Sequence, residues 1–183
     1  AVLADGIPGG FAGLYRAYTD LETLGRCRRG YFLDGLGGAQ FALPGAVERL
    51  RDLRDTSDSE PYAVVIGAAD PAQPYGAQVP WPQAASGARG PSRTFGAQVV
   101  LVDGLPVLFL DRGGKRLISL GEPPAESLGH AVRALADWVR AGSRRRVIIA
   151  TFDGEDVRDT PVAAHLRDNG FTPDLRGLEL RGG

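Results

Sequence analysis

Two apolar segments joined by Asp103-Gly104 place the strongest constraint on the fold of this chain. Residues 98–102 read Gln-Val-Val-Leu-Val and residues 106–110 read Pro-Val-Leu-Phe-Leu. Asp-Gly is favoured in two-residue hairpin turns because it tolerates the positive φ angles that such turns require. The two segments therefore predict an antiparallel hairpin, and a glycine-containing turn after it predicts a second hairpin with residues 115–120.

Short apolar segments elsewhere predict further strands. They lie at residues 62–68, 146–152 and 178–181. About half a dozen short strands joined by tight turns are typical of a small barrel or a strongly curled sheet. We therefore expect a small β-barrel in this part of the chain.

Two helices are expected to pack on the barrel. The first lies near residues 123–141 and the second near residues 160–169. Thr160 is predicted as the N-cap of the second helix, with Pro161 at its first position, where a proline costs no helical hydrogen bond.

The beginning of the chain shows a different order of elements. Residues 11–24 place apolar side chains at helical spacing, and Gly25 follows where a helix commonly ends. Residues 26–33 and 39–43 then predict two short strands around a glycine-rich turn at residues 34–38. The apolar stripe of the helix consists of Phe11, Leu14, Tyr15, Tyr18, Leu21 and Leu24.

A helix over residues 44–55, with Val47 and Leu50 facing inward, completes this order. Residues 1–5 are predicted to be the tail of a preceding helix. Helix end, tight turn, helix and hairpin together are typical of the second half of a winged helix-turn-helix. A polar break near residues 56–61 then predicts the module boundary.

The predicted fold is therefore α+β with two modules. A partial winged helix-turn-helix occupies residues 1–55. A small β-barrel with two packing helices occupies residues 56–183.

Basic and aromatic residues of the winged-helix part predict contact with nucleic acid through phosphates and stacking. Asp20 and Glu22 share the exposed face of the helix, which argues against base reading there, and such modules also serve as protein-packing elements. The candidate residues are Arg16, Thr19 and Thr23 on the helix, and Arg26, Arg28, Arg29 and Tyr31 at the wing.

A second basic cluster contains Arg140 and residues 144–146. Arg144 and Arg145 are candidates for phosphate contact. The alternative is a solvated helix end, because arginines also complement the dipole at a helix C-terminus.

Two loops leave further alternatives open. Tyr75 and Trp81 lie among prolines and could stack on bases, although such aromatics more often cover the end of a barrel. The segment 83–93 predicts a mobile loop whose arginines, Arg89 and Arg93, keep it solvated rather than bind phosphate.

Catalytic motifs are scarce. The chain has neither a Walker phosphate-binding loop nor a Gly-x-Ser-x-Gly elbow. Asp153 directly follows a predicted strand and is the one candidate for acid/base chemistry, although Asp153-Gly154 is also a turn dipeptide.

Composition narrows the function classes. The net charge of −1 excludes a polycation, so nucleic-acid binding would need a local basic patch. One cysteine, Cys27, and two histidines show no pattern of metal ligands, so neither a metal nor a cofactor is expected in this chain.

No apolar run approaches the about 18 residues of a membrane helix, and a cytoplasmic location is expected. The absence of methionine predicts a processed product or an excised piece of a longer protein.

Several colinear segments carry a family resemblance. They are Gly-Ile-Pro-Gly-Gly-Phe-Ala-Gly-Leu-Tyr at 6–15, Arg-Arg-Gly-Tyr-Phe at 28–32, Gly-Ala-Gln-Phe-Ala-Leu-Pro-Gly-Ala-Val at 37 and 39–47, Asp-Pro-Ala-Gln-Pro-Tyr-Gly at 70–76, Val-Leu-Val-Asp-Gly at 100–104, Arg-Gly-Gly-Lys-Arg-Leu at 112–117 and Gly-Leu-Glu-Leu-Arg at 177–181. Together they resemble the C-terminal region of large helicase-related (Lhr) proteins.

The resemblance implies a piece from the end of a superfamily 2 DNA helicase whose 3′-to-5′ motor, with its ATP and Mg²⁺ sites, lies in an N-terminal core. It also implies tandem winged-helix modules that end in a β-barrel, a link to oligomerisation, and a likeness to DNA glycosylases that remove uracil. No catalytic aspartate is carried over from the family, because no matching motif is present in this sequence.

We therefore expect an accessory nucleic-acid-binding and assembly segment of an Lhr-type DNA repair helicase. Its expected partners are single-stranded or tailed duplex DNA, the upstream modules of the parent protein and a second copy of itself, with no membrane. Two alternatives stay open, namely a uracil-type DNA glycosylase and a purely structural oligomerisation module.

Overall fold

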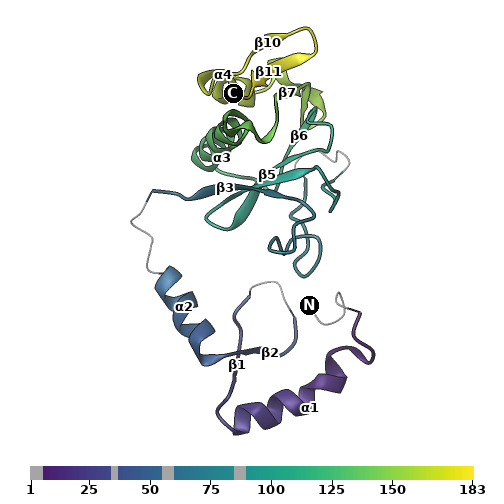
Figure 1. The fold of residues 1–183 in the computed structure, drawn as a ribbon, viewed down its shortest axis with the longest axis vertical. Helices are drawn as coiled ribbons and strands as arrows, with labels where there is room; N and C mark the ends of the chain where they lie inside the picture. The colour runs from purple at the N-terminus through teal and green to yellow at the C-terminus, as the bar shows by residue number, and fades with distance from the viewer. Residues whose placement is uncertain (1–5, 34–36, 55–59, 85–89) are drawn as a thin grey trace. The chain divides into compact units, whose positions relative to one another are not determined.

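The computed structural model describes residues 6–33, 37–54, 60–84 and 90–183 (Figure 1). The chain divides into two compact units. Unit 1 contains residues 1–60 with Ala77–Pro80, and unit 2 contains Pro61–Gly76 and Trp81–Gly183. The predicted helix tail at 1–5, and parts of the predicted wing turn, module boundary and loop at 83–93, lie outside the described residues.

Unit 1 follows the predicted order of helix, two strands and helix. Its elements are α1 (Gly10–Thr23), β1 (Arg28–Gly30), β2 (Gln40–Ala42) and α2 (Pro44–Arg54). The two strands pair in antiparallel fashion, with Arg29 opposite Phe41, and are shorter than predicted. This arrangement is consistent with the second half of a winged helix.

Gly25 ends α1 in the way that the sequence predicts. Its φ of 70° lies in the left-handed region, which glycine adopts at little cost. Its N–H donates to the Glu22 carbonyl and the Arg26 N–H to the Leu21 carbonyl, each at 2.9 Å, which is a Schellman closure. The closure turns the chain from α1 directly into β1.

The interior of unit 1 is small and largely aromatic. Tyr18 stacks on Phe41 with ring centroids 5.2 Å apart, and the buried Cys27 thiol donates to the Tyr18 carbonyl at 3.5 Å. Val47 of α2 is buried as predicted, but Leu50 is 43% exposed. Leu50 instead lines an open, mostly apolar groove of about 980 Å³.

Unit 2 is built on a six-stranded sheet. Its strands are β3 (Ala63–Gly67), β4 (Gln98–Val102), β5 (Leu105–Leu110), β6 (Arg116–Ser119), β8 (Thr151–Phe152) and β9 (Glu155–Asp156), in that spatial order. Neighbouring strands are antiparallel except β6 and β8, which run parallel. The predicted hairpin at Asp103-Gly104 is confirmed, with positive φ at both residues.

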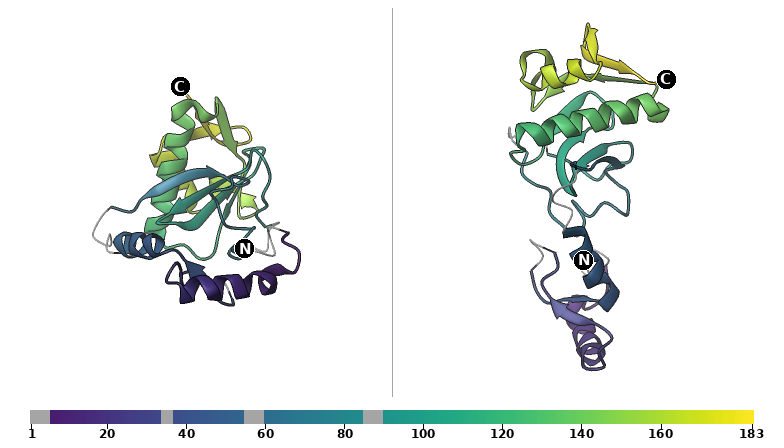
Figure 2. Two further views of the ribbon diagram at one scale, coloured as in Figure 1. Left: turned by 60° about the horizontal axis from the view of Figure 1, so that its bottom comes forward. Right: turned by 90° about the vertical axis from the view of Figure 1, so that its left-hand side faces the viewer.

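A smaller sheet and the helices complete unit 2. The small sheet has the order β10 (Thr172–Asp174), β11 (Gly177–Arg181) and β7 (Arg146–Ile149). Helix α3 (Ala125–Trp138) continues into a π-helical turn at Val139–Ser143, and α4 (Val162–Asp168) follows a 3₁₀ turn at Val157–Asp159. Figure 2 shows α3 lying between the large sheet and the C-terminal elements.

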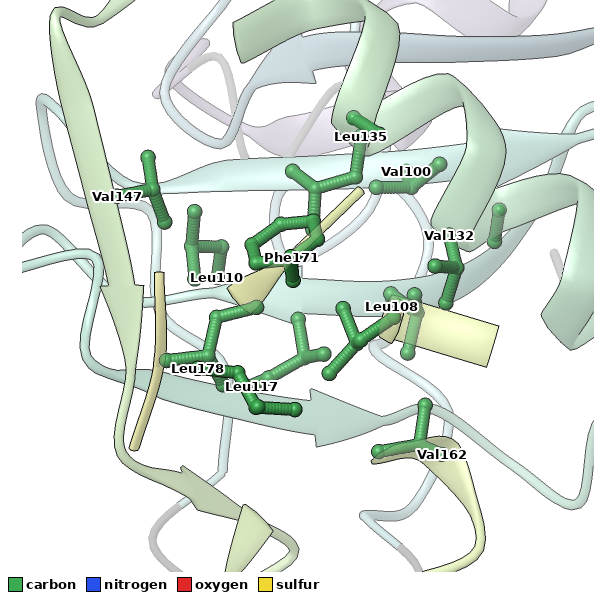
Figure 3. Close-up of a cluster of buried hydrophobic side chains, with 14 of the residues drawn as sticks. Val100, Leu108, Leu110, Leu117, Val132, Leu135, Val147, Val162, Phe171 and Leu178 are labelled. Carbon is green, nitrogen blue, oxygen red and sulfur yellow. The ribbon is translucent and has the colours of Figure 1, made fainter. Parts of the chain in front are cut away.

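The large sheet is buried on both faces, so its central strands are apolar at successive positions. On one face Leu108, Leu110 and Leu117 pack against α3 and against Phe171 and Leu178 (Figure 3). The alternating residues, which point to the other face, form a second cluster with Trp81. That cluster contains Ala68, Ala97, Val99, Phe109, Ile118 and Leu120.

The prediction of a β-barrel is wrong. In the part of the chain that the structure describes, none of the sheets closes on itself, and β3 and β9 are the edges of the large one. The predicted strand at 146–152 is interrupted at Ala150, so that β7 joins the small sheet while β8 pairs with β6. Because this segment is divided between two sheets, it does not join the two edges of either sheet into a closed barrel.

The predicted cap of α4 is also different. The Thr160 hydroxyl donates to the Val157 carbonyl at 2.8 Å and does not cap the helix. Pro161 is the N-cap residue, and α4 begins at Val162.

Across the described ranges, no helix combines the length and apolar character needed to span a bilayer.

Candidate nucleic-acid interface

The exposed face of α1 presents fewer free groups than the sequence predicts. Arg16 is exposed. The hydroxyls of Thr19 and Thr23, however, donate to the carbonyls four residues earlier, at 2.9 and 3.0 Å. Of the two acidic residues on this helix, Asp20 is exposed, whereas Glu22 pairs with β1 and its charge is compensated.

Arg29 is held by neighbouring side chains of unit 1, although 38% of its side chain stays exposed. Its guanidinium donates to Glu22 at 2.6 Å and to the Tyr15 hydroxyl at 2.9 Å, and it lies over the rings of Tyr15 and Phe41. The hydrogen bond with Glu22 raises the pKa of Arg29 above its ordinary value. Arg29 therefore ties the wing strand to α1.

Arg28 is the contrasting neighbour. Successive side chains of a strand point to opposite faces, so Arg28 points away from the α1 contacts of Arg29. It is exposed, and the described residues offer its side chain no ion pair or hydrogen bond. Arg26 is exposed just before the strand and Tyr31, just after it, is 91% exposed. We call Arg26, Arg28 and Tyr31 the wing residues.

Gln40 organises the chain that carries the wing residues. Its side-chain oxygen accepts the N–H groups of Phe32 and Leu33, both at 2.8 Å, and its amide donates to the Leu33 carbonyl at 2.9 Å. These bonds fix the backbone directly after Tyr31. Sequence reasoning missed Gln40, because a polar residue in a short strand gives no signal of this role.

The second basic cluster separates into different roles. Arg144 donates to the carbonyls of Gly96 and Arg112, at 2.6 and 2.9 Å, and lies over the Trp138 ring. Arg140 pairs with Asp137, and Arg146 with Glu179. Arg145 is exposed, and within the described ranges its side chain has neither an ion pair nor a hydrogen bond.

Asp153 lies in the turn between β8 and β9 with a φ of 51°. Its two carboxylate oxygens accept the Ser119 N–H at 2.8 Å and the Ser119 hydroxyl at 2.7 Å. Ser119 is buried in β6. The carboxylate therefore holds the turn against the large sheet, with a hydrogen bond to each oxygen.

Tyr75 and Trp81 pack on unit 2 itself. Their rings stack with centroids 6.2 Å apart, and Trp81 meets Phe109 edge-on. The Tyr75 hydroxyl donates to the Gly104 carbonyl at 3.0 Å, and burial raises the pKa of Tyr75. Both aromatics cover the face of the large sheet that lies opposite α3.

Arg93 is bound to backbone and does not simply solvate its loop. Its guanidinium donates to the carbonyls of Gln73 and Asp70, at 2.6 and 3.0 Å, and also to that of Tyr75. Arg93 therefore joins its own loop to the backbone of residues 70–75. The prediction that its role is solvation is therefore wrong.

The described parts of the chain contain neither a Walker-type loop for ATP nor a cluster of side chains that could bind Mg²⁺. The single lysine, Lys115, lies in the hairpin turn between β5 and β6, where its N–H donates to Asp111. A Walker loop instead connects a strand to a helix. Within the described ranges, His, Cys, Asp and Glu side chains do not gather in groups of three or more that could hold a metal ion.

Comparison with known proteins gives consistent matches. The family model for the winged-helix domain of large helicase-related protein matches residues 1–62. The chain is 45% identical over 191 residues to "Lhr helicase/ probable uracil glycosylase" of Mycolicibacterium smegmatis. It is 36% identical over 181 residues to "Lhr helicase/uracil glycosylase" of Escherichia coli.

These matches cover 99% and 98% of this chain but only 12% of the length of each relative. The segments that carry the resemblance in the sequence are therefore part of a match along almost the whole chain. The chain therefore corresponds to one part of the large helicase-related (Lhr) proteins.

Proposed function

We propose that this chain is an accessory nucleic-acid-binding and assembly segment of an Lhr-type ATP-dependent DNA helicase that acts in DNA repair. One observation carries the proposal. The winged-helix match covers the residues in which Arg26, Arg28 and Tyr31 are exposed while the guanidinium of Arg29 is paired with Glu22. A wing strand that exposes one arginine and anchors the next suits a surface that approaches a phosphate backbone.

The wing residues would act mainly through charge. Arg26 and Arg28 neutralise phosphates and release counterions, which gives binding that weakens with salt. Tyr31 stacks on an unpaired base. Gln40 holds the backbone after Tyr31, so that little conformational entropy is lost on binding. Single-stranded or tailed duplex DNA in the cytoplasm is the proposed ligand.

Unit 2 supplies the assembly role in this proposal. It has its own core and packs against upstream modules of the parent protein or against a second copy. In this proposal, ATP and Mg²⁺ bind to the motor of the parent protein.

Binding of a labelled tailed duplex, followed by fluorescence anisotropy at several salt concentrations, tests the wing. Arg28→Ala is expected to weaken binding and to reduce the slope of log K against log salt by about 1. Arg133→Ala on α3 is the matched control, because Arg133 is exposed and belongs to unit 2. Equal affinities for Arg28→Ala and the unmodified chain would remove the wing from the proposal.

A second candidate function is removal of uracil from DNA. The names of both relatives include uracil glycosylase, and such enzymes flip the target base out of the stack. Asp153 is the candidate for activating water, although both its oxygens accept hydrogen bonds from Ser119. Abasic-site formation on uracil-containing DNA that is lost in Asp153→Asn, with the fold intact, would support it. Full activity in that variant would exclude Asp153.

A third candidate is a purely architectural module. It predicts self-association or binding to upstream modules with no affinity for DNA. Sedimentation across a range of protein concentrations, beside the anisotropy assay, separates it from the first proposal. Concentration-dependent mass without DNA binding would favour it.

A further inference from the structure

Phe95 is presented at the tip of a tight turn in unit 2 and is 90% exposed. The Ala97 N–H donates to the Thr94 carbonyl at 3.1 Å and closes the turn. Gly96 follows Phe95 with a φ of 86°, the left-handed conformation that a type II turn requires at this position. An apolar ring held out in this way gains nothing from burial in the chain itself.

The turn is anchored on both sides of Phe95. Before it, Arg93 donates to the carbonyls of Gln73 and Tyr75. After it, the Gly96 carbonyl accepts a hydrogen bond from Arg144 at 2.6 Å. The backbone that carries the ring is therefore fixed, and binding through the ring would cost little conformational entropy.

Positive charges gather beside this turn for a structural reason. Gln98 of β4 pairs with Leu110 of β5, so the segments before β4 and after β5 meet at one end of the sheet. Arg144 donates to the carbonyls of Gly96 and Arg112. These two bonds join the segment that contains Arg144 to the segment before β4 and to the segment after β5.

Three cations in these segments are unused by the fold. Arg112, Lys115 and Arg145 are exposed, and the described residues provide none of their side chains with an ion pair or a hydrogen bond. The nearby Asp111 carboxylate accepts the N–H groups of Lys115 and Arg116, at 2.9 and 3.1 Å. Phe95, Arg112, Lys115 and Arg145 are named the Phe95 patch.

We propose that the Phe95 patch binds a single-stranded nucleic acid, with one base stacked on Phe95 and neighbouring phosphates contacted by Arg112, Lys115 and Arg145. An aromatic ring flanked by cations matches the alternation of base and phosphate along a single strand. A duplex keeps its base faces stacked, and an acidic peptide would leave the ring without a partner. The patch shares no residue with the wing, so it is a second surface beyond the proposed function.

Phe95→Ala tests the stacking contact in the full 183-residue chain. Loss of one stacked base is expected to weaken binding of a ~12-nucleotide single strand by about 5-fold or more. Phe95→Trp keeps an aromatic face and is expected to bind like the unmodified chain. Leu175→Ala is the matched control, because Leu175 is 97% exposed in the turn between β10 and β11.

An abasic position in the strand separates stacking from an indirect effect. Strands of otherwise uniform sequence, each with one abasic site, are bound to the unmodified chain and to Phe95→Ala. At one position the abasic site is expected to weaken binding to the unmodified chain and to have no further effect on Phe95→Ala. Equal penalties for both proteins at every position would overturn the stacking contact.

The charge contribution is read from the salt dependence. Lys115→Ala combined with Arg145→Ala is expected to reduce the salt slope for a single strand by about 1.4, at about 0.7 for each phosphate. Arg176→Ala, next to Leu175, is the control for loss of an exposed charge.

Two outcomes would overturn the proposal, namely single-strand affinity unchanged by Phe95→Ala and a salt slope unchanged in the double variant. Arg28→Ala measured on the same strands keeps the two surfaces apart. If Arg28→Ala leaves binding unchanged, the Phe95 patch is not affected by that result. If Phe95→Ala leaves binding unchanged, the wing residues are likewise not affected.

Discussion

Glu22 binds Arg29 at two points. One carboxylate oxygen accepts the guanidinium of Arg29 at 2.6 Å and the other accepts its backbone N–H at 3.2 Å. The pair joins the last turn of α1 to the first strand of the wing. It also gives two adjacent arginines of the same strand different roles, since Arg28 has no such partner in the described residues.

Substitution of these two arginines is expected to separate stability from binding. Arg29→Ala should lower the thermal midpoint, because it removes the contacts with Glu22, Tyr15 and Phe41. Arg28→Ala should change the free energy of unfolding by no more than about 0.5 kcal/mol, because the side chain is exposed. Thermal unfolding followed by circular dichroism, beside the anisotropy assay, measures both. A stability loss in Arg28→Ala as large as that in Arg29→Ala would contradict the assignment.

Arg144→Ala is expected to destabilise unit 2 by about 1–3 kcal/mol, because the carbonyls of Gly96 and Arg112 lose a charged donor. Arg145→Ala is the matched control and should be close to neutral, since its side chain is exposed. Urea unfolding of the two variants measures the difference. Equal midpoints for both would show that the Arg144 contacts contribute nothing to stability.

Asp153→Ala is expected to cost about 1–3 kcal/mol, because the Ser119 N–H and hydroxyl lose their acceptor. Asp153→Asn should cost less, since asparagine tolerates the positive φ of this position and keeps one acceptor oxygen. Ser119→Ala combined with Asp153→Ala completes a double-mutant cycle. A coupling energy below about 0.5 kcal/mol in that cycle would show that the pair does not act as a unit.

Asp156 and Arg158 predict a pH dependence of stability. The hydrogen bond from Arg158 lowers the pKa of Asp156 from 3.8 to about 2. Because the pKa is lower in the folded chain, the stabilisation is present above about pH 4 and is lost as the pH falls toward about 2. The difference in thermal midpoint between the unmodified chain and Asp156→Asn should therefore be largest near neutral pH and shrink as the pH falls through about 2. A difference that is constant over this range would contradict the prediction.

Local signals in the sequence were sufficient for most elements. The Asp103-Gly104 turn, the helical spacing from Phe11 and the stop at Gly25 each depend on residues close together in the chain. The same holds for the predicted strand that became β4, whose bounds match residues 98–102. Local conformational preference decides these features before any long-range contact forms.

The arginines show where local signals end. Arg28 and Arg29 are identical in type and adjacent in the chain, yet Glu22 and the rings of Tyr15 and Phe41 lie on one side of the strand only. Arg144 and Arg145 differ in the same way, because the carbonyl partners of Arg144 are 48 and 32 residues away. Phe95 gave no signal at all, since its exposure depends on how distant segments meet beside its turn.

By itself, the sequence determined the likeness to Lhr proteins, most of the helices and strands, and the hairpin turn at Asp103-Gly104. The tertiary structure decided that the sheets stay open, that the segment 146–152 is divided between two of them and which cations are left free. The physical reason is that secondary structure follows from neighbouring residues, whereas closure of a sheet and pairing of a charge depend on partners that only the folded chain brings together.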